Sequence, residues 1–292
     1  MDSRRVLLEA WLPAVLSQTY QLQGWGEPGE GRLEPASADA SFRRYFRWQF
    51  LLLEDMGART YLQTIEAGVD EAELERLYDA AVDTLVRWQL SSRPGVLPEY
   101  DEAVLRRELQ LFPDWYVTRE KGRELSAGEQ AEWEALCSLL LDSILAESRV
   151  FVHRDYMPRN LMTAPGEPGV LDFQDALYGP VSYDVTSLFA DAFFCLPLPR
   201  REAWLRTYWQ RAWDAGVAVP DACDTFMDQS RLMGVQRHLK VLGIFARICH
   251  RDGKPHYLAD APRFISYLHE ACERDARLAP LRRLLESLEM RP

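Results

Sequence analysis

A short hairpin pattern interrupts a chain whose sequence is otherwise typical of helices from Glu71 onward. The apolar segments 150–152, 161–163 and 170–173 are too short for helices and fit short strands. The residues at 164–169, which include two prolines and two glycines, lie between the last two segments and are of the kind that forms turns. The sequence therefore predicts a hairpin with a further strand just before it.

The predicted hairpin brings oxygen-bearing side chains together. Pairing of its strands sets Leu161 roughly opposite Leu171, which places Asn160 beside Asp172. The loop before the hairpin supplies a second carboxylate, Asp155. Carboxylate and amide oxygens are the ligands that Mg²⁺ prefers, together with water and substrate phosphates. We therefore expect Asn160 and Asp172 to hold magnesium, which leaves Asp155 to accept a proton from a substrate hydroxyl.

The spacing of these residues matches a catalytic signature. His153-Arg154-Asp155 is followed after four residues by Asn160, and Asp172-Phe173 comes after the hairpin, as in protein kinases. Phosphoryl transfer requires the protein mainly to hold the nucleophile in line and to neutralise charge, so two cation ligands and one base suffice. A polar loop followed by an ordinary acid at a strand end is the alternative. The combined order and spacing favour the catalytic interpretation.

Three neighbouring polar residues allow more than one role. His153 is expected to organise the loop rather than to act as a base, because Asp155 already fills that role. Asp175 is either a further ligand for the cation or the phosphates, or an ordinary turn residue after a strand. Asp184 is expected to cap a helix or to hold the catalytic loop rather than to touch a ligand.

The acidic composition restricts the partners of this chain. It has 45 Asp and Glu against 34 Lys and Arg, and the formal net charge of -11 repels nucleic acid and anionic membrane surfaces. We expect neither as a partner, and nothing in the sequence implies a protein partner. Five widely separated cysteines indicate neither a disulfide framework nor a zinc site, which fits a reducing cytoplasm. The N-terminal segment is amphipathic and unlike a signal peptide, so a soluble, unprocessed protein is expected.

Apolar residues three and four positions apart predict a mostly helical second part of the chain. The segments with this pattern are Leu74–Trp88, Glu129–Leu145, Arg200–Ala215, Thr225–Ile248 and Ala261–Ala276. Before them the sequence predicts a helix at about Val6–Leu22, a strand at Phe42–Arg47 and a buried strand at Phe50–Leu53 that ends in a connector.

These motifs resemble the aminoglycoside phosphotransferase and choline kinase family, which shares the protein-kinase fold. The resemblance implies a bilobal α+β fold with a small N-terminal lobe built on an antiparallel sheet, incomplete here, and a larger, mostly helical C-terminal lobe. The expected boundaries are 1–53 for the first lobe, 54–57 for the hinge and 58–292 for the second lobe. The family further implies ATP as cosubstrate and Mg²⁺, with Asp155 as catalytic base and Asn160 and Asp172 as metal ligands.

The resemblance also assigns roles around the nucleotide. It implies that the connector Leu53–Met56, including Glu54 and Met56, offers backbone hydrogen bonds to adenine. The chain between Asp172 and Asp184 is short and lacks an A-P-E element, which disfavours a protein substrate and regulation by loop phosphorylation.

Within this family the chain is similar to bacterial anomeric amino-sugar kinases of cell-wall recycling, through segments 35–46, 151–162 and 171–176. The similarity implies phosphorylation of N-acetylmuramate and N-acetylglucosamine at C1. It also implies a phosphate-covering loop of small residues with free backbone N–H groups, formed by Ser37, Ala38, Asp39, Ala40 and Ser41. In the sugar site, Arg237 could pair with the lactyl carboxylate of a muramic acid, or be an ordinary solvated arginine, and His238 is a further donor.

The sequence departs from the family at one point. A kinase N-terminal lobe needs a strand with a phosphate-pairing lysine and a helix with its glutamate, yet only Gln49 separates Trp48 from Phe50. Either the protein has lost this unit, or the molecule contains residues that the sequence omits. The second explanation is favoured, because losing strands would expose the apolar segment Phe50–Leu53 and leave unpaired strand edges.

Two other functions remain open at this stage. One is an antibiotic or amino-alcohol kinase of the same fold. The other is a catalytically silent nucleotide-binding module, which becomes credible if the deletion is real. The presence of Asp155, Asn160 and Asp172 counts against the silent module.

Overall fold

The computed structural model describes residues 56–163, 168–190, 194 and 196–291. The chain divides into two compact units, 1–49 and 50–292, and every described residue belongs to the second. The predicted helix and strands before residue 56, the phosphate loop Ser37 to Ser41, and Glu54 lie outside the described residues. The predicted lobe boundaries stay predictions.

The second unit is α+β and mostly helical, which confirms the predicted fold class. Its helices are α2 (Tyr61–Glu66), α3 (Glu71–Leu90), α4 (Glu102–Leu109), η1 (Phe112–Glu120, a π-helix), α5 (Ala127–Leu145), η2 (Pro158–Asn160), α6 (Tyr183–Phe189), α7 (Leu198–Ala215), α8 (Cys223–Asp252), η3 (Pro255–Asp260), α9 (Ala261–Arg274), η4 (Ala276–Leu278) and α10 (Ala279–Ser287). All five helices predicted after residue 71 are confirmed as α3, α5, α7, α8 and α9. Among the described residues, no helix is both long and apolar enough to span a membrane.

Four short strands form two small antiparallel sheets. Strand β1 (Arg149–Val152) pairs with β4 (Leu177–Pro180), and β2 (Leu161–Met162) pairs with β3 (Gly169–Val170). The predicted hairpin is therefore present, but its register differs from the prediction. Leu161 lies opposite Val170, not Leu171, and the backbone N–H of Leu171 bonds the carbonyl of Asn160 instead.

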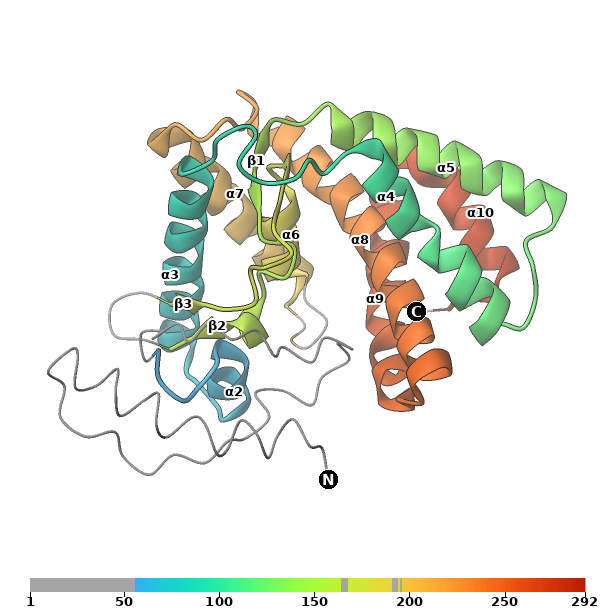
Figure 1. Cartoon of the computed structure of the whole chain (residues 1–292), viewed down its shortest axis with the longest axis horizontal. Coiled ribbons are helices and arrows are strands. Elements are labelled where there is room, and N and C mark those ends of the chain that lie inside the picture. Colours follow the sequence, from blue (N-terminus) through green and yellow to red (C-terminus); the bar gives the residue numbers. More distant parts are fainter. Residues whose placement is uncertain (1–55, 164–167, 191–193, 195, 292) are drawn as a thin grey trace, which may run out of the picture. The chain divides into compact units, whose positions relative to one another are not determined.

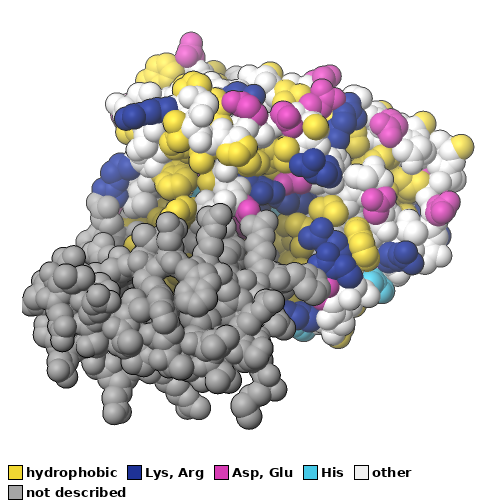
Figure 2. All heavy atoms as spheres, viewed as in Figure 1, with side chains coloured by type: hydrophobic (Ala, Val, Ile, Leu, Met, Phe, Trp, Pro, Cys, Tyr) yellow, Lys and Arg dark blue, Asp and Glu magenta, His cyan; other side chains and the backbone are white. Residues whose placement is uncertain are grey.

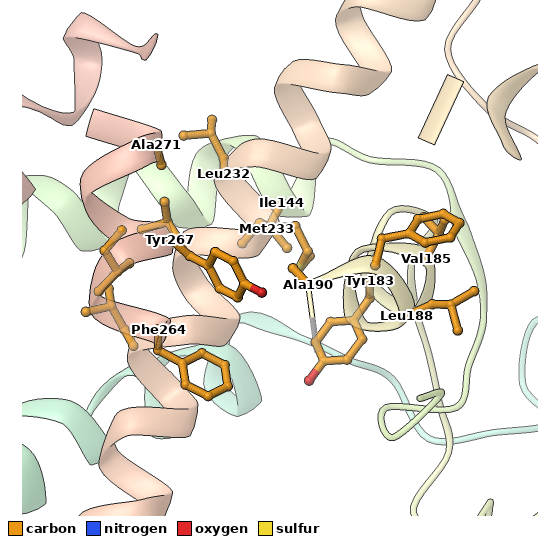
Figure 3. Packing of buried hydrophobic residues seen from close by; sticks show 14 of the residues in the cluster. Ile144, Tyr183, Val185, Leu188, Ala190, Leu232, Met233, Phe264, Tyr267 and Ala271 are labelled. Atoms are coloured by element: carbon orange, nitrogen blue, oxygen red, sulfur yellow. The ribbon is translucent and has the colours of Figure 1, made fainter. Parts of the chain in front are cut away.

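Helix α8 is the centre of the helical core. It packs against η1, α5, α6, α7 and α9, and α10 lies along α5 (Figure 1). Close approach to η1 is possible because α8 carries Gly243, where an added Cβ would lie 2.7 Å from the Cβ of Leu111. Figure 3 shows part of the apolar cluster, with Val185 and Leu188 of α6, Met233 of α8 and Phe264 of α9.

Capping residues explain where several helices begin. Ser126 accepts a hydrogen bond from the backbone N–H of Glu129, whose carboxylate accepts one from the backbone N–H of Ser126, at the start of α5. Asp70 and Asp101 cap α3 and α4 in the simpler way, through one carboxylate oxygen each. On the face seen in Figure 2, the described part of the surface carries basic and acidic side chains interspersed rather than separated by sign.

Candidate active site

The loop after β1 carries the predicted base in a strained backbone conformation. Arg154, directly before Asp155, has φ 77°, in the left-handed region that costs a non-glycine residue about 1–2 kcal/mol. The backbone N–H of Asp155 donates to Nδ1 of His153 at 3.3 Å. His153 is fully buried, with its ring 5.9 Å from that of Trp88 and 5.8 Å from that of Tyr156. His153 therefore contacts the backbone of its own loop, and its role as loop organiser stays a prediction.

Asp184 holds this loop from the beginning of α6. Its carboxylate accepts the backbone N–H of His153 at 2.7 Å and that of Arg154 at 2.9 Å. Burial raises the pKa of Asp184 to about 6, although the neighbouring His153, the two N–H donors and Arg237 act in the opposite direction. Of the two roles considered for Asp184, the contacts correspond to holding the loop, since α6 is preceded by Ser182 at the cap position.

A buried ionic cluster lies beneath the same loop. The guanidinium of Arg154 donates to Glu108 at 2.6 Å, and Lys240 of α8 lies 2.8 Å from the same carboxylate oxygen. Tyr100 and Gln236 also donate to Glu108. Burial alone would raise the pKa of Glu108, but Lys240 and Arg154 outweigh it and lower that pKa to about 2. Glu108 is therefore ionised at neutral pH and fixes Arg154.

The sequence did not single out Glu108 or Lys240. Glu108 lies 46 residues before Arg154, and no motif surrounds it. The one available signal was that Lys240 falls within a long apolar helical pattern, where a charged residue is buried only with a partner.

The backbone of the hairpin links the segments that carry Asn160 and Asp172. Leu171 donates its N–H to the carbonyl of Asn160 at 2.9 Å, so Asp172 follows one residue after a bond at the beginning of β2. Asp172 also has a left-handed φ, 68°, and its exposed carboxylate accepts Nε2 of Gln174 at 2.5 Å. The strain at Asp172 points to a functional requirement, because such conformations persist where the surroundings enforce them.

These two residues fit a magnesium ion in donor chemistry. The Nδ2 of Asn160 donates to the carbonyl of Asp155 at 2.8 Å, which leaves the amide oxygen of Asn160 as the atom able to face a cation. Mg²⁺ typically takes one or two carboxylates and completes its shell with water and substrate phosphates. The described residues contain no group of three His, Cys, Asp or Glu that could hold a metal ion.

The connector that precedes α2 is attached to the hairpin. Met56, predicted to contact adenine, lies over Gly169, where an added Cβ would come within 2.9 Å of the Met56 Cβ. Thr163 donates through both its backbone N–H and its hydroxyl to the carbonyl of Arg59. The hairpin that carries the predicted metal ligands therefore also supports the connector.

The three residues predicted for the substrate site lie in different surroundings. The guanidinium of Arg237 lies 5.2 Å from the centre of the Tyr183 ring. His238, on another face of α8, contacts the rings of Phe264 and Tyr267. Asp175 is half-buried, and its backbone carbonyl accepts Nη1 of Arg154 at 3.3 Å. Arg237 and Asp175 are thus near the catalytic loop, whereas His238 points elsewhere.

His238 lines a cavity of about 80 Å³ between α6, α7, α8 and α9. Thr186 and Ser230 line it too, and a polar side-chain atom of each of these three residues is buried without a hydrogen-bond partner in the described structure. Burial, Arg237 and Arg201 lower the pKa of His238 well below its ordinary value, so its ring is neutral. A few ordered water molecules in this cavity would supply hydrogen bonds to these three polar atoms.

The site is that of a phosphotransferase, and the chain belongs to the phosphotransferase enzyme family, whose profile matches residues 38–223. More particularly, it is similar to proteins named N-acetylmuramate/N-acetylglucosamine kinase. That of Pseudomonas aeruginosa is 48% identical over 333 residues, covering 98% of this chain and 97% of the relative. That of Pseudomonas putida is 46% identical over 334 residues, covering 99% and 97%.

Both alignments are longer than the 292 residues of this chain, so both relatives contain residues that have no counterpart here. Among solved structures, the gentamicin complex of the aminoglycoside phosphotransferase APH(2″)-IIa is similar with a TM-score of 0.48 and 14% identity. The match covers 72% of this chain and 67% of that one.

Proposed function

We propose that this chain is an ATP- and Mg²⁺-dependent kinase that phosphorylates the anomeric C1 hydroxyl of N-acetylmuramate and N-acetylglucosamine in cell-wall recycling. The observation that carries the proposal is the loop at Asp155, whose backbone is fixed by Asp184 and by the Arg154–Glu108 ion pair. The names of relatives that are nearly half identical over almost the whole chain support these two acceptors.

In the proposed reaction, the C1 oxygen forms a bond to the γ-phosphorus of ATP while the bond from that phosphorus to the β,γ-bridging oxygen breaks. ADP leaves, and the C1 hydroxyl proton passes to the carboxylate of Asp155. Magnesium held by Asn160 and Asp172 would neutralise charge on the phosphates. An anomeric hydroxyl is more acidic than a simple alcohol, so an ionised carboxylate of ordinary basicity is a sufficient acceptor.

Residues of the chain prepare this transfer without forming covalent bonds. His153 and Asp184 hold the backbone on either side of Arg154, and Asn160 holds the carbonyl of Asp155. These contacts position the base before the acceptor arrives, which is the main contribution a protein makes to phosphoryl transfer.

We also propose a cytoplasmic location. ATP is the cosubstrate, and the described cysteines Cys137, Cys223, Cys249 and Cys272 are all free thiols, as a reducing compartment would keep them.

The test is a comparison of acceptors and of one variant. Wild-type protein with magnesium and ATP should convert N-acetylmuramate and N-acetylglucosamine to 1-phosphates, identified by phosphorus NMR. Asp155→Asn should lower kcat by about 10²–10⁴-fold, the usual contribution of a general base, while ATP binding measured by calorimetry persists. The matched control is Asp214→Asn, an exposed aspartate on α7.

Three results would count against the proposal. Product formed only with aminoglycosides or choline would favour the other kinase activities. Equal turnover by wild type and Asp155→Asn would remove Asp155 from the mechanism. Nucleotide binding without turnover of any acceptor would indicate a silent module.

A further inference from the structure

We propose that Arg237 binds the carboxylate of the acceptor and thereby discriminates N-acetylmuramate from N-acetylglucosamine. This inference rests on the proposed function, since it concerns the same acceptor site. N-acetylmuramate carries a 3-O-lactyl group that ends in a carboxylate, and N-acetylglucosamine has a hydroxyl at that position. A cation that recognises this group would act on one acceptor only.

The first observation is that Arg237 is a buried cation with unused hydrogen-bond donors. Arg237 is only 4% exposed. In the part of the chain that the structure describes, its Nε and Nη1 are buried without an acceptor. Leaving a buried charged donor unpaired is costly, and buried arginines are normally paired with carboxylates. Arg237 therefore has the donors that an incoming carboxylate would use, in the fork geometry that suits it.

The second observation is that nearby carboxylates are occupied by other groups. Glu108 accepts hydrogen bonds from Arg154, Lys240, Tyr100 and Gln236. Asp184 uses one oxygen for the backbone N–H of His153 and the other for that of Arg154. Arg237 influences Asp184 electrostatically, but no hydrogen bond joins the two among the described residues. Its guanidinium lies over the face of the Tyr183 ring.

The third observation places Arg237 close to the catalytic loop. Tyr183 lies at the beginning of α6 (Figure 3). The guanidinium of Arg237 lies 5.2 Å from the centre of its ring, and the ammonium of Lys240 lies 5.5 Å from it. Lys240 donates to the Tyr183 hydroxyl at 2.9 Å and interacts electrostatically with Asp155. Arg237 therefore shares the Tyr183 ring with Lys240, which also pairs with Glu108 beneath the catalytic loop. The proposal places C1 of the acceptor at Asp155 and the lactyl carboxylate at Arg237, on the side of Tyr183.

The experiment compares the two acceptors in wild type, Arg237→Met and Arg237→Lys. We expect the ratio of kcat/KM for N-acetylmuramate to that for N-acetylglucosamine to fall by about tenfold to a hundredfold in Arg237→Met, the usual loss for a charge-assisted hydrogen bond. Arg237→Lys should restore part of that ratio. The matched control is Arg201→Met, because Arg201 is also buried but is already paired with Glu270 at 2.6 Å, and its ratio should equal that of wild type.

A second measurement needs no variant. Wild-type enzyme should have a KM for the methyl ester of N-acetylmuramate that is about tenfold or more above that for the free acid, because the ester has no charge for Arg237 to bind. If the Arg237 variants do not fold, this measurement decides. An unchanged acceptor ratio in folded Arg237→Met, or equal KM for ester and acid, would overturn the assignment of Arg237. A wild type that phosphorylates neither sugar would instead overturn the proposed function.

Discussion

Two residues of the site, Arg154 and Asp172, adopt left-handed backbone conformations that only glycine adopts without cost. Each is held by neighbours rather than by its own preference. Arg154 is anchored through its backbone N–H to Asp184 and through its guanidinium to Glu108. Directly before Asp172, the hydrogen bond from the backbone N–H of Leu171 to the carbonyl of Asn160 fixes the course of the chain. Strain at these two positions supports a functional role for the residues they present.

Glu147 offers a test of how buried carboxylates shape stability. It is 4% exposed and accepts hydrogen bonds from the backbone and hydroxyl of Ser182, just before α6. Burial, only partly offset by these bonds, raises its pKa from 4.5 to about 7. Because the folded state holds the proton more tightly, the free energy of unfolding falls as pH rises through the window from about 4.5 to 7.

We predict that wild type loses about 2–3 kcal/mol of stability through this group between pH 5 and pH 8, and that Glu147→Gln abolishes the loss. A glutamine can accept from the Ser182 backbone and donate to its hydroxyl, so the contact survives without the charge. Urea unfolding at both pH values measures the difference. The exposed Glu124→Gln serves as control and should keep the wild-type pH dependence. The same pH dependence in Glu147→Gln and wild type would contradict the assignment.

At the scale of elements, α8 connects the catalytic loop to the rest of the helical core. Gln236 and Lys240 face Glu108 beneath the loop, whereas Ser230, Gly234 and His238 line the cavity toward α6, α7 and α9. The two faces follow from helical geometry, because residues four positions apart share a face. A change on one face of α8 should therefore be separable from a change on the other.

Two glycines of α8 allow a matched prediction. An added Cβ at Gly234 would make ordinary contacts, 3.5 Å from Thr186 and 3.6 Å from His238, whereas one at Gly243 would overlap the backbone of Leu111. Gly234→Ala should stabilise the protein by about 0.5–1 kcal/mol, because alanine restricts the unfolded chain. Gly243→Ala should destabilise it by about 1–3 kcal/mol or more through overpacking against η1. Thermal unfolding of both variants tests this, and equal shifts in Tm would refute it.

At the scale of the whole molecule, the 292-residue chain is shorter than relatives that it matches over almost its whole length. We propose that the difference lies between Gln49 and Phe50, where a kinase N-terminal lobe needs its lysine strand and glutamate helix. The described unit contains the predicted base and metal ligands, and the hydrogen bonds from Asn160 to Asp155 and from Leu171 to Asn160 lie within it. Nucleotide affinity is the property that would suffer.

This leads to a prediction for the 292-residue chain. Inserting the corresponding segment of the Pseudomonas aeruginosa relative between Gln49 and Phe50 should lower the KM for ATP by about tenfold or more, the value of a charged hydrogen bond to phosphate. An insert of equal length made of glycine and serine is the control and should leave KM high. Steady-state kinetics with varied ATP measures both. Equal KM values for ATP in the chimera, the control and the unmodified chain would show that this segment does not contribute to ATP binding.

The catalytic motif and the long helices were determined by the sequence alone, because both are local. The interval from Asp155 to Asn160 is one loop and turn, and the apolar spacing in α8 repeats every turn of the helix. Strand β4 was missed because Gly179 and Pro180 are typical of turns, and it forms only by pairing with β1. The hairpin register was predicted one residue away, since short strands carry little pattern to align.

What only the tertiary structure decided is which distant residues meet. Glu108 with Arg154 and Lys240, and Arg237 with Tyr183, come together from segments that share no local pattern. Periodicity tells which face of a helix is buried but not which partner it meets, because the partner is chosen by packing of the whole core. The class of this protein could thus be predicted from one short stretch of sequence, while the surroundings of the predicted base depended on the complete fold.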